Sequence, residues 1–204
     1  MRTIGITGGV GAGKSLILNY MKEHYRAKIY MADEIAHFLK EPGQSCYKPL
    51  IELLGKEILE PDGTINKGRM AEKIFADDAL LKQVNGILHP AVKAFILSEI
   101  EKERKKGKAD FFVLEAALLI EEHYDEILDE LWYIRADEDV RCRRLRETRN
   151  YSEERTAGIM KSQLSDTYFK LHCDIIIDNN KDAVHAYKQI DAILGEYISE
   201  ENKQ

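Results

Sequence analysis

The most informative pattern in this sequence is a series of five short apolar runs separated by amphipathic stretches. The runs are rich in Ile, Val, Phe or Tyr and are apolar at nearly every position rather than at every second one. Strands that are covered on both faces have this pattern, so the runs predict a parallel sheet between helices. We expect the strands at Thr3–Thr7, Lys28–Ala32, Phe111–Glu115, Leu131–Arg135 and Asp174–Asp178.

Helices are predicted between these strands, as parallel connections require. The first covers Ser15–Tyr25, and an acidic start at Asp137 predicts another helix through about residue 147. A third begins in the same way at Ser152. Lys181–Ile198 has apolar residues at helical spacing, which predicts an amphipathic closing helix, and the polar tail Ser199–Gln204 is expected to fray.

The interval between the second and third strands, residues 34–108, is longer than one crossover helix needs. Turn signals at Glu41-Pro42-Gly43, Pro61-Asp62-Gly63 and His89-Pro90 divide it. The predicted helices are Glu34–Lys40, Gln44–Leu54, Lys67–Phe75, Asp78–Leu88 and Ala91–Lys106. We interpret the interval as a helical insertion on an α/β core.

Composition narrows the class of protein. The chain has 204 residues, 44% apolar and 32% charged, which fits one large domain or a domain with an insertion and excludes both a disordered tail and a membrane protein. The N-terminus shows no secretion segment. A net charge of −6 argues against nucleic acid as the main partner. Three sparse cysteines read as reduced thiols, so we expect a cytoplasmic location.

The strongest motif is Gly8-Gly9-Val10-Gly11-Ala12-Gly13-Lys14-Ser15, which follows a predicted strand and opens a predicted helix. Glycines let successive backbone N–H groups converge on one anion, and the helix start adds its positive dipole end. Lys14 can reach the β- and γ-phosphates of ATP, and Ser15 can place its hydroxyl on Mg²⁺. Glu115, which ends the third strand, is either a water-mediated Mg²⁺ ligand or a loop cap. The alternative for the motif is an ordinary glycine-rich turn with a surface lysine.

Other motifs favour a small kinase among phosphate-loop proteins. A regulatory GTPase carries Asp-x-x-Gly, which is absent, and Asn180-Lys181-Asp182-Ala183 lacks the second Asp that reads guanine. A remodelling ATPase needs a longer chain. A kinase needs a group that orients the acceptor hydroxyl and cations that close over the phosphates.

Asp33 is the candidate for the orienting group. It follows the second predicted strand, at the carboxyl edge of the sheet where ligands bind in open α/β folds. A carboxylate there can align an attacking hydroxyl and accept its proton. Asp is also a favoured N-cap, so a cap for the helix Glu34–Lys40 is the alternative.

The densest cationic cluster follows the fourth predicted strand and consists of Arg141, Arg143, Arg144, Arg146 and Arg149. Arginine suits multidentate phosphate contact, and a closing lid here would exclude water. We expect one or two of these arginines to bind phosphate. The others would form a solvated helix face that pairs with Glu138, Asp139 and Glu147.

Taken together, these residues resemble the dephospho-coenzyme A kinase family over nearly the whole chain. Beside the phosphate loop, the resemblance is carried by the order and spacing of Ala32-Asp33, Ile35-Ala36, Glu41-Pro42-Gly43, Asp62-Gly63, Ile74-Phe75, Leu88-His89-Pro90, Leu118-Leu119-Ile120-Glu121, Arg144-Leu145, Gln163, Asp174 and Ile177-Asp178-Asn179. It implies transfer of the γ-phosphate of ATP to the ribose 3′-hydroxyl of dephospho-CoA, with no nucleic-acid or membrane partner. No feature of the sequence specifies an oligomeric state.

The resemblance also implies a fold and a set of site residues. The fold is a three-layer P-loop kinase core (about 1–33, 109–140 and 170–204) with a five-stranded parallel sheet, a helical CoA-binding insertion (about 34–108) and a lid (about 141–169). Catalytic roles fall to Asp33, Lys14 and Arg144. The other implied contacts are Gly8, Gly9, Val10, Gly11, Ala12, Gly13, Lys14, Ser15, Leu16 and Asn179 for ATP, Ser15 for Mg²⁺, and Thr7, Asp33, His89 and Pro90 for the acceptor.

The chain departs from the family pattern in four places. The usual Asp-Ala-Asp is Met31-Ala32-Asp33, so only the second carboxylate is present, and the usual Pro-Leu-Leu is Ala117-Leu118-Leu119. Leu16 replaces a frequent Thr, and the second lid arginine of the family corresponds to Arg149, which is about one position out of register. Two alternatives stay open: a kinase of another small acceptor, such as a nucleoside monophosphate, and a nucleotide-dependent switch.

Overall fold

The computed structural model describes residues 1–201, which fold as two compact units. The core unit consists of residues 1–29 and the described residues from 103 onward, and the helical unit is Tyr30–Lys102. Among the described residues, no helix combines the length and the apolar character that a membrane crossing requires. The predicted division into core, insertion and lid stays a prediction.

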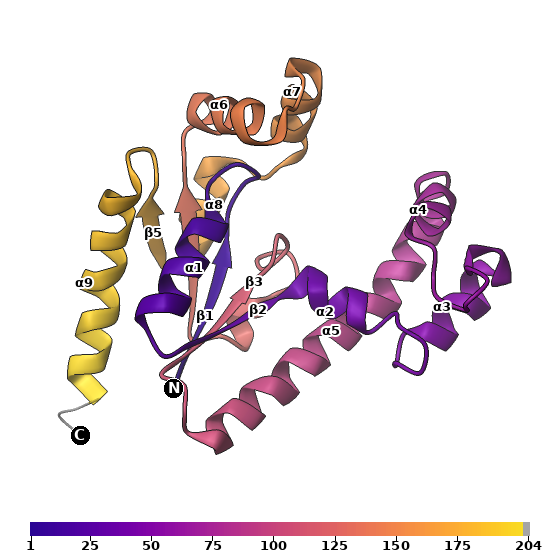
Figure 1. Cartoon of the computed structure of the whole chain (residues 1–204), viewed down its shortest axis with the longest axis horizontal. Helices are drawn as coiled ribbons and strands as arrows, with labels where there is room; N and C mark the ends of the chain where they lie inside the picture. Colours follow the sequence, from indigo (N-terminus) through magenta and orange to yellow (C-terminus); the bar gives the residue numbers. More distant parts are fainter. Residues whose placement is uncertain (202–204) are drawn as a thin grey trace. The chain divides into compact units, whose positions relative to one another are not determined.

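Five strands form one sheet in the order β2-β3-β1-β4-β5 (Figure 1). Their bounds are Arg2–Thr7 (β1), Ala27–Met31 (β2), Phe111–Glu115 (β3), Glu130–Arg135 (β4) and Ile175–Asp178 (β5). β1 pairs in parallel with β3 and β4, and β4 pairs in parallel with β5. All five predicted strands are therefore confirmed, and the fold class is α/β with a parallel sheet.

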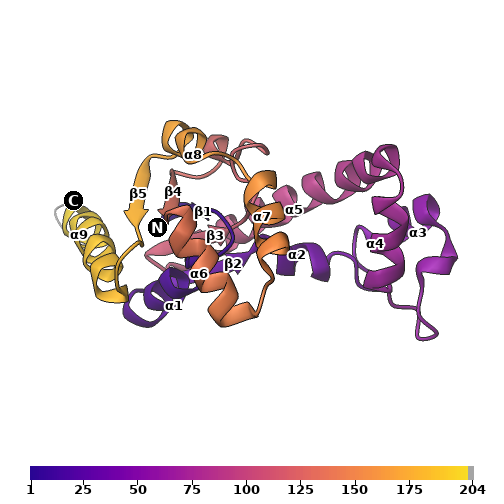
Figure 2. The same cartoon turned by 90° about the horizontal axis from the view of Figure 1, so that it is seen from above.

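Helices cover both faces of this sheet in the core unit, which explains the continuously apolar strands. On one face, α1 (Lys14–His24) and α9 (Ala183–Glu201) meet where the rings of Tyr20 and Tyr187 stack 3.9 Å apart. α8 (Asp166–His172) lies on the other face (Figure 2). It packs on β4 through Phe169, whose ring lies 4.6 Å from that of Tyr133. Trp132 on β4 is fully buried, as its apolar context predicts.

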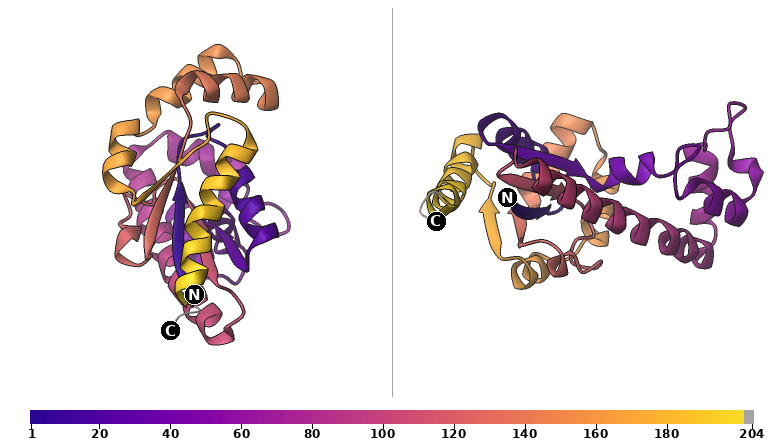
Figure 3. Two further views of the ribbon diagram at one scale, coloured as in Figure 1. Left: turned by 90° about the vertical axis from the view of Figure 1, so that its left-hand side faces the viewer. Right: turned by 90° about the horizontal axis from the view of Figure 1, so that it is seen from below.

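Two helices between β4 and β5 lie beyond the carboxyl ends of the strands (Figure 3). They are α6 (Glu138–Arg149) and α7 (Glu153–Ser162). Ser152 caps α7 by accepting a hydrogen bond from Arg155 N, as predicted. Asp137 occupies the N-cap position of α6, but its carboxylate accepts from Arg135 instead of capping the helix.

Three outcomes differ from the predicted elements. α8 was not predicted, although Ser165 marks its start by accepting a hydrogen bond from Tyr168 N. Short 3₁₀ turns, η1 (Lys56–Ile58) in the helical unit and η2 (Tyr124–Glu126) in the core unit, were also missed. α9 continues past its predicted end to Glu201, and the rest of the predicted frayed tail, residues 202–204, lies outside the described residues.

The helical unit contains α2 (Ala32–Phe38), α3 (Tyr47–Leu54) and α4 (Lys67–Phe75), close to the predicted helices. The prediction of two helices divided at His89-Pro90 is wrong, because α5 is a single helix, Asp78–Lys106, with Pro90 inside it. Proline removes one hydrogen bond and costs about 3 kcal/mol in a helix interior. Apolar residues of α5 are buried both before and after Pro90, including Val84 and Ile96. We infer that this burial stabilises the helix on both sides of the proline and offsets the cost of Pro90.

Candidate active site

The glycine-rich loop joins β1 to α1 and approaches its neighbours too closely for side chains. Gly8, Gly11 and Gly13 have positive φ angles of 143°, 83° and 93°. A Cβ atom on Gly13 would lie 2.2 Å from Nδ2 of Asn179, and one on Gly9 would lie 2.3 Å from a guanidinium nitrogen of Arg141. Backbone conformation therefore requires glycine at Gly8, Gly11 and Gly13, and at Gly8 a Cβ would also lie 2.6 Å from the backbone oxygen of Ile134.

Lys14, the first residue of α1, points back across the loop. Its ammonium donates to the carbonyl of Gly8 at 2.7 Å and lies 3.4 Å from Oε1 of Glu115. Burial lowers the pKa of Lys14, the Glu115 carboxylate raises it, and the charges of Arg141 and Arg149 lower it further. Several cations thus converge at the loop, an arrangement that favours a bound polyanion.

Arginines of α6 contact the backbone of the same loop. Arg141 Nε donates to Val10 O at 2.9 Å, and its guanidinium also donates to the Gln163 side chain. Arg144 donates to Asn179 O at 2.8 Å and to Ala12 O at 3.4 Å. Burial lowers the pKa of both guanidinium groups.

These contacts divide the arginine cluster. Arg146 lies on a solvated face, as expected. It pairs with Glu153 of α7 at 3.4 Å, however, and not with an acidic residue of its own helix. Arg144 was singled out from the sequence, whereas Arg141 was recognised only as a member of the cluster. The spacing in the sequence already places Arg141 on the same helix face as Arg144, because residues three apart on a helix are neighbours.

Two buried side-chain oxygens beside the loop have no hydrogen-bond partner among the described residues. They are Thr7 Oγ1, at the end of β1, and Asn179 Oδ1, directly after β5. Both residues are 1% exposed, and Asn179 donates through Nδ2 to Ala12 O at 2.7 Å. Buried polar atoms are almost always paired, so such orphans are typical of a site that receives a ligand.

Asp33, in the helical unit, is exposed in the first turn of α2. The N-cap position belongs to Met31, so the alternative interpretation of Asp33 as a helix cap is wrong. The carboxylate of Asp33 interacts electrostatically with Lys40. Burial and the charge of Lys67 lower the pKa of Lys40, and the charge of Asp33 raises it in part. Asp33 and the glycine loop belong to different units, and their cooperation stays a prediction.

A cavity of about 530 Å³ lies within the helical unit. Most of its wall is apolar and includes Met70, Ile74 and Val84, while Lys40 and Lys67 contribute positive charge to its lining. His89 is half-buried and Pro90 exposed in the middle of α5. Small-molecule sites are commonly cavities of this size with a few polar groups.

The glycine loop joins a parallel strand to a helix, Lys14 donates to its backbone, and arginines of α6 also contact it. This arrangement defines a phosphate-loop kinase. A family model for dephospho-CoA kinase matches residues 2–185. The chain therefore belongs to the dephospho-CoA kinase family, the enzymes of the final step of coenzyme A biosynthesis.

Individual proteins with similar sequences or structures are also dephospho-CoA kinases. Dephospho-CoA kinase of Oceanobacillus iheyensis is 32% identical over 191 residues, covering 94% of this chain and 95% of its own. The enzyme of Dehalococcoides mccartyi is 34% identical over 181 residues, covering 88% and 89%. A solved dephospho-CoA kinase from Campylobacter jejuni has the same fold, with a TM-score of 0.73 at 21% identity over 99% of this chain and 100% of that one.

Proposed function

We propose that this chain transfers the γ-phosphate of ATP to the ribose 3′-hydroxyl of dephospho-CoA, with the triphosphate over Gly8–Ser15. The bond between the γ-phosphorus and the bridging oxygen breaks, a bond to the ribose oxygen forms, and ADP leaves. The observation that supports this proposal most directly is that Lys14 and Arg141 both donate hydrogen bonds to backbone carbonyls of the glycine loop. We keep the expectation of a cytoplasmic enzyme, which the three free cysteines support.

The loop residues supply binding and charge stabilisation. Lys14 holds the carbonyl of Gly8 and lies near Glu115, so on ATP binding its ammonium exchanges these partners for phosphate oxygens. Arg144 approaches the phosphates from α6, and Asn179, which touches the loop carbonyl of Ala12, lies beside the adenine. The unpartnered oxygens of Thr7 and Asn179 then gain ligand or solvent partners.

Magnesium fits the same residues. No group of three or more His, Cys, Asp or Glu side chains in residues 1–201 is arranged to hold a metal ion by itself. Ser15 is exposed at the first turn of α1, and its hydroxyl is the ligand that the chain offers to Mg²⁺ on the phosphates, with Glu115 beside Lys14 as a water-mediated one. When bound, the ion neutralises charge that develops between the β- and γ-phosphates.

The helical unit supplies the acceptor side. Asp33 aligns the ribose 3′-hydroxyl and accepts its proton, a role for which an exposed carboxylate at the start of α2 is suited. Lys40 and Lys67 in the cavity match the diphosphate of dephospho-CoA, and the apolar wall of Met70 and Ile74 matches its pantetheine arm. The expectation that His89 and Pro90 also contact the acceptor belongs to the same proposal.

The test is direct. Purified protein with ATP, Mg²⁺ and dephospho-CoA should yield 3′-phosphorylated CoA, identified by mass spectrometry. Absence of product above background at saturating substrates rejects the proposal. A panel of acceptors compared by kcat/KM distinguishes dephospho-CoA from nucleoside monophosphates, and tight ATP binding with no phosphorylated acceptor would favour a nucleotide-dependent switch.

A further inference from the structure

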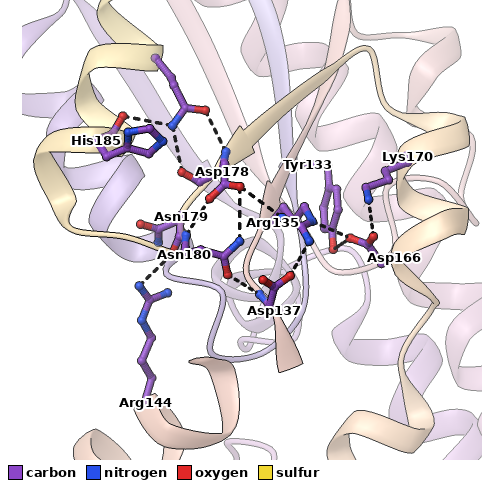
Figure 4. Close-up of polar contacts among 11 residues, drawn as sticks. Tyr133, Arg135, Asp137, Arg144, Asp166, Lys170, Asp178, Asn179, Asn180 and His185 are labelled. Carbon is purple, nitrogen blue, oxygen red and sulfur yellow. Dashed lines mark hydrogen bonds and ion pairs between the residues drawn. The ribbon is translucent and has the colours of Figure 1, made fainter. Parts of the chain in front are cut away.

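One guanidinium in the core unit contacts three carboxylates (Figure 4). Arg135 is the last residue of β4. Its Nη1 lies 3.2 Å from Oδ2 of Asp178, its Nε lies 3.3 Å from Oδ1 of Asp166, and its Nη2 pairs with Asp137. Its side chain is only 25% exposed. Three ion pairs on a single arginine are more than an incidental surface contact.

The positions of these carboxylates in the chain are the key observation. Asp137 is the N-cap of α6, and Asp166 is the first residue of α8. They therefore mark the beginning and the end of one excursion, residues 138–165, which contains α6 and α7. Asp178 is the last residue of β5. Arg135 thus joins both ends of the excursion to two adjacent strands of the sheet.

The beginning of the excursion is also held by backbone hydrogen bonds. Asp178 Oδ1 accepts from Asn180 N at 2.9 Å, and Asn180 Oδ1 accepts from Asp137 N at 2.6 Å. Burial opposes ionisation of Asp178, but the hydrogen bonds from Asn180 and the charge of Arg135 lower its pKa overall. The carboxylate that faces Arg135 from the sheet is therefore ionised at neutral pH.

The end of the excursion is held by side-chain contacts, one from β4 and one from within α8. Asp166 Oδ1 accepts from the Tyr133 hydroxyl at 3.0 Å, and Oδ2 pairs with Lys170 at 2.6 Å. Burial opposes the ionisation of Asp166, while hydrogen bonds from Lys170 and Tyr133 and the charge of Arg135 lower its pKa. Arg135 and Tyr133 of β4 hold the end at Asp166, and Arg135 also pairs with Asp137 at the beginning, so Arg135 is the group common to both ends.

This arrangement bears on the phosphate loop because the excursion carries the arginines that touch it. Arg141 is four residues after Asp137, about one helical turn, and donates to Val10 O. Gln163, three residues before Asp166, accepts from the Arg141 guanidinium. A shift at either end of the excursion would move the Arg141 guanidinium relative to the loop.

We propose that Arg135 is a positioning residue of the kinase, which holds both ends of residues 138–165 at the sheet edge and so sets Arg141 and Arg144 over the phosphate loop. It does not touch the nucleotide itself. Without the guanidinium, Asp137 and Asp178 repel each other where α6 begins, and the end at Asp166 is left with the Tyr133 hydroxyl as its polar contact with β4. The proposal rests on nucleotide binding at the loop and does not depend on the identity of the acceptor.

The test compares ATP dissociation constants, measured by titration calorimetry, for R135Q, R135K and a control. The control is R146Q, because Arg146 lies on α6 with Arg141 and Arg144 and pairs with Glu153, whose side chain is 86% exposed. A displacement of about 1 Å in a positioned group can lower the rate of a catalysed reaction about 100-fold, and we expect a smaller but measurable effect on ATP affinity. R135Q should therefore bind ATP about tenfold or more weakly, R135K should fall between it and the wild type because one ammonium cannot serve three carboxylates, and R146Q should bind normally.

Coupling to Arg141 separates positioning from general stability. R141A should weaken ATP binding in the wild type but have little further effect in R135Q, since the guanidinium is already misplaced there. Additive losses, or normal ATP affinity in a folded R135Q protein, would overturn the proposal. If R135Q does not fold, the double variant D137N/D166N releases both ends while keeping Arg135. Normal ATP affinity in that variant would equally refute it. Failure of the wild type to bind ATP would instead reject the proposed function.

Discussion

Gly13→Ala is the substitution that the geometry of the phosphate loop specifies most sharply. The new methyl would lie 2.2 Å from Nδ2 of Asn179, well inside contact distance, at a backbone φ of 93°. An L-residue in the left-handed region costs roughly 1–2 kcal/mol. Asn179 cannot remain where it is, so its 2.7 Å hydrogen bond to Ala12 O is lost.

The magnitude follows from these two effects. Loss of a hydrogen bond between buried groups costs about 1–3 kcal/mol when the groups stay unpaired. Together with the backbone strain, the expected decrease in the free energy of unfolding is about 2–5 kcal/mol. For a chain of this size, each kcal/mol corresponds to about 2–4 °C, so the melting temperature should fall by roughly 4–20 °C.

The assay is thermal unfolding with and without ATP, and Gly158→Ala is the matched control. Gly158 lies in α7, and a Cβ there meets no atom within 4 Å. Alanine is favoured over glycine in a helix by about 1 kcal/mol, so this variant should be slightly more stable than the wild type. Gly13→Ala should also lose most of the stabilisation by ATP. A Gly13→Ala protein with wild-type melting temperature and ATP response would refute the close packing of Asn179 under the loop.

Four further predictions concern chemistry. Lys14→Ala should lower kcat by about 10²–10³-fold, as the loss of one preorganised charge contact does, and activity close to wild type would exclude the phosphate role. Asp33→Asn should reduce kcat with a smaller change in ATP affinity, whereas lost ATP binding with persistent turnover would contradict an orienting role. Lys40→Ala combined with Lys67→Ala should raise KM for dephospho-CoA while leaving KM for ATP unchanged, and the reverse pattern would place the acceptor elsewhere. Burial raises the pKa of Cys173 to about 12; its alkylation at pH 8 should therefore be far slower than that of a model thiol, as followed by mass spectrometry, and fast labelling would contradict this environment.

The sequence anticipated the parts of the fold that depend on local patterns. β3 and β4 are buried on both faces and are apolar almost throughout, so their sequence alone predicted strands in a parallel sheet. The glycine loop was equally predictable, because positive φ angles and close contacts at Gly11 and Gly13 leave little choice of residue.

Local patterns failed where another part of the chain decided the outcome. Pro90 is a helix breaker by propensity, yet buried residues on both sides keep it inside α5. Asp137 has the sequence of a helix cap, yet the guanidinium of Arg135 takes its carboxylate. In both cases a tertiary contact outweighs a local preference of a few kcal/mol or less.

The sequence by itself determined the five strands, most of the helices and the presence of a phosphate loop, because each is encoded in the spacing of neighbouring residues. Only the tertiary structure decided that Arg141 and Arg144 contact the loop while Arg146 pairs with Glu153, and that Arg135 joins both ends of the excursion 138–165. These arginines are chemically alike and close in sequence. Their different roles arise from the carbonyls and carboxylates that the fold brings within hydrogen-bond distance of each side chain.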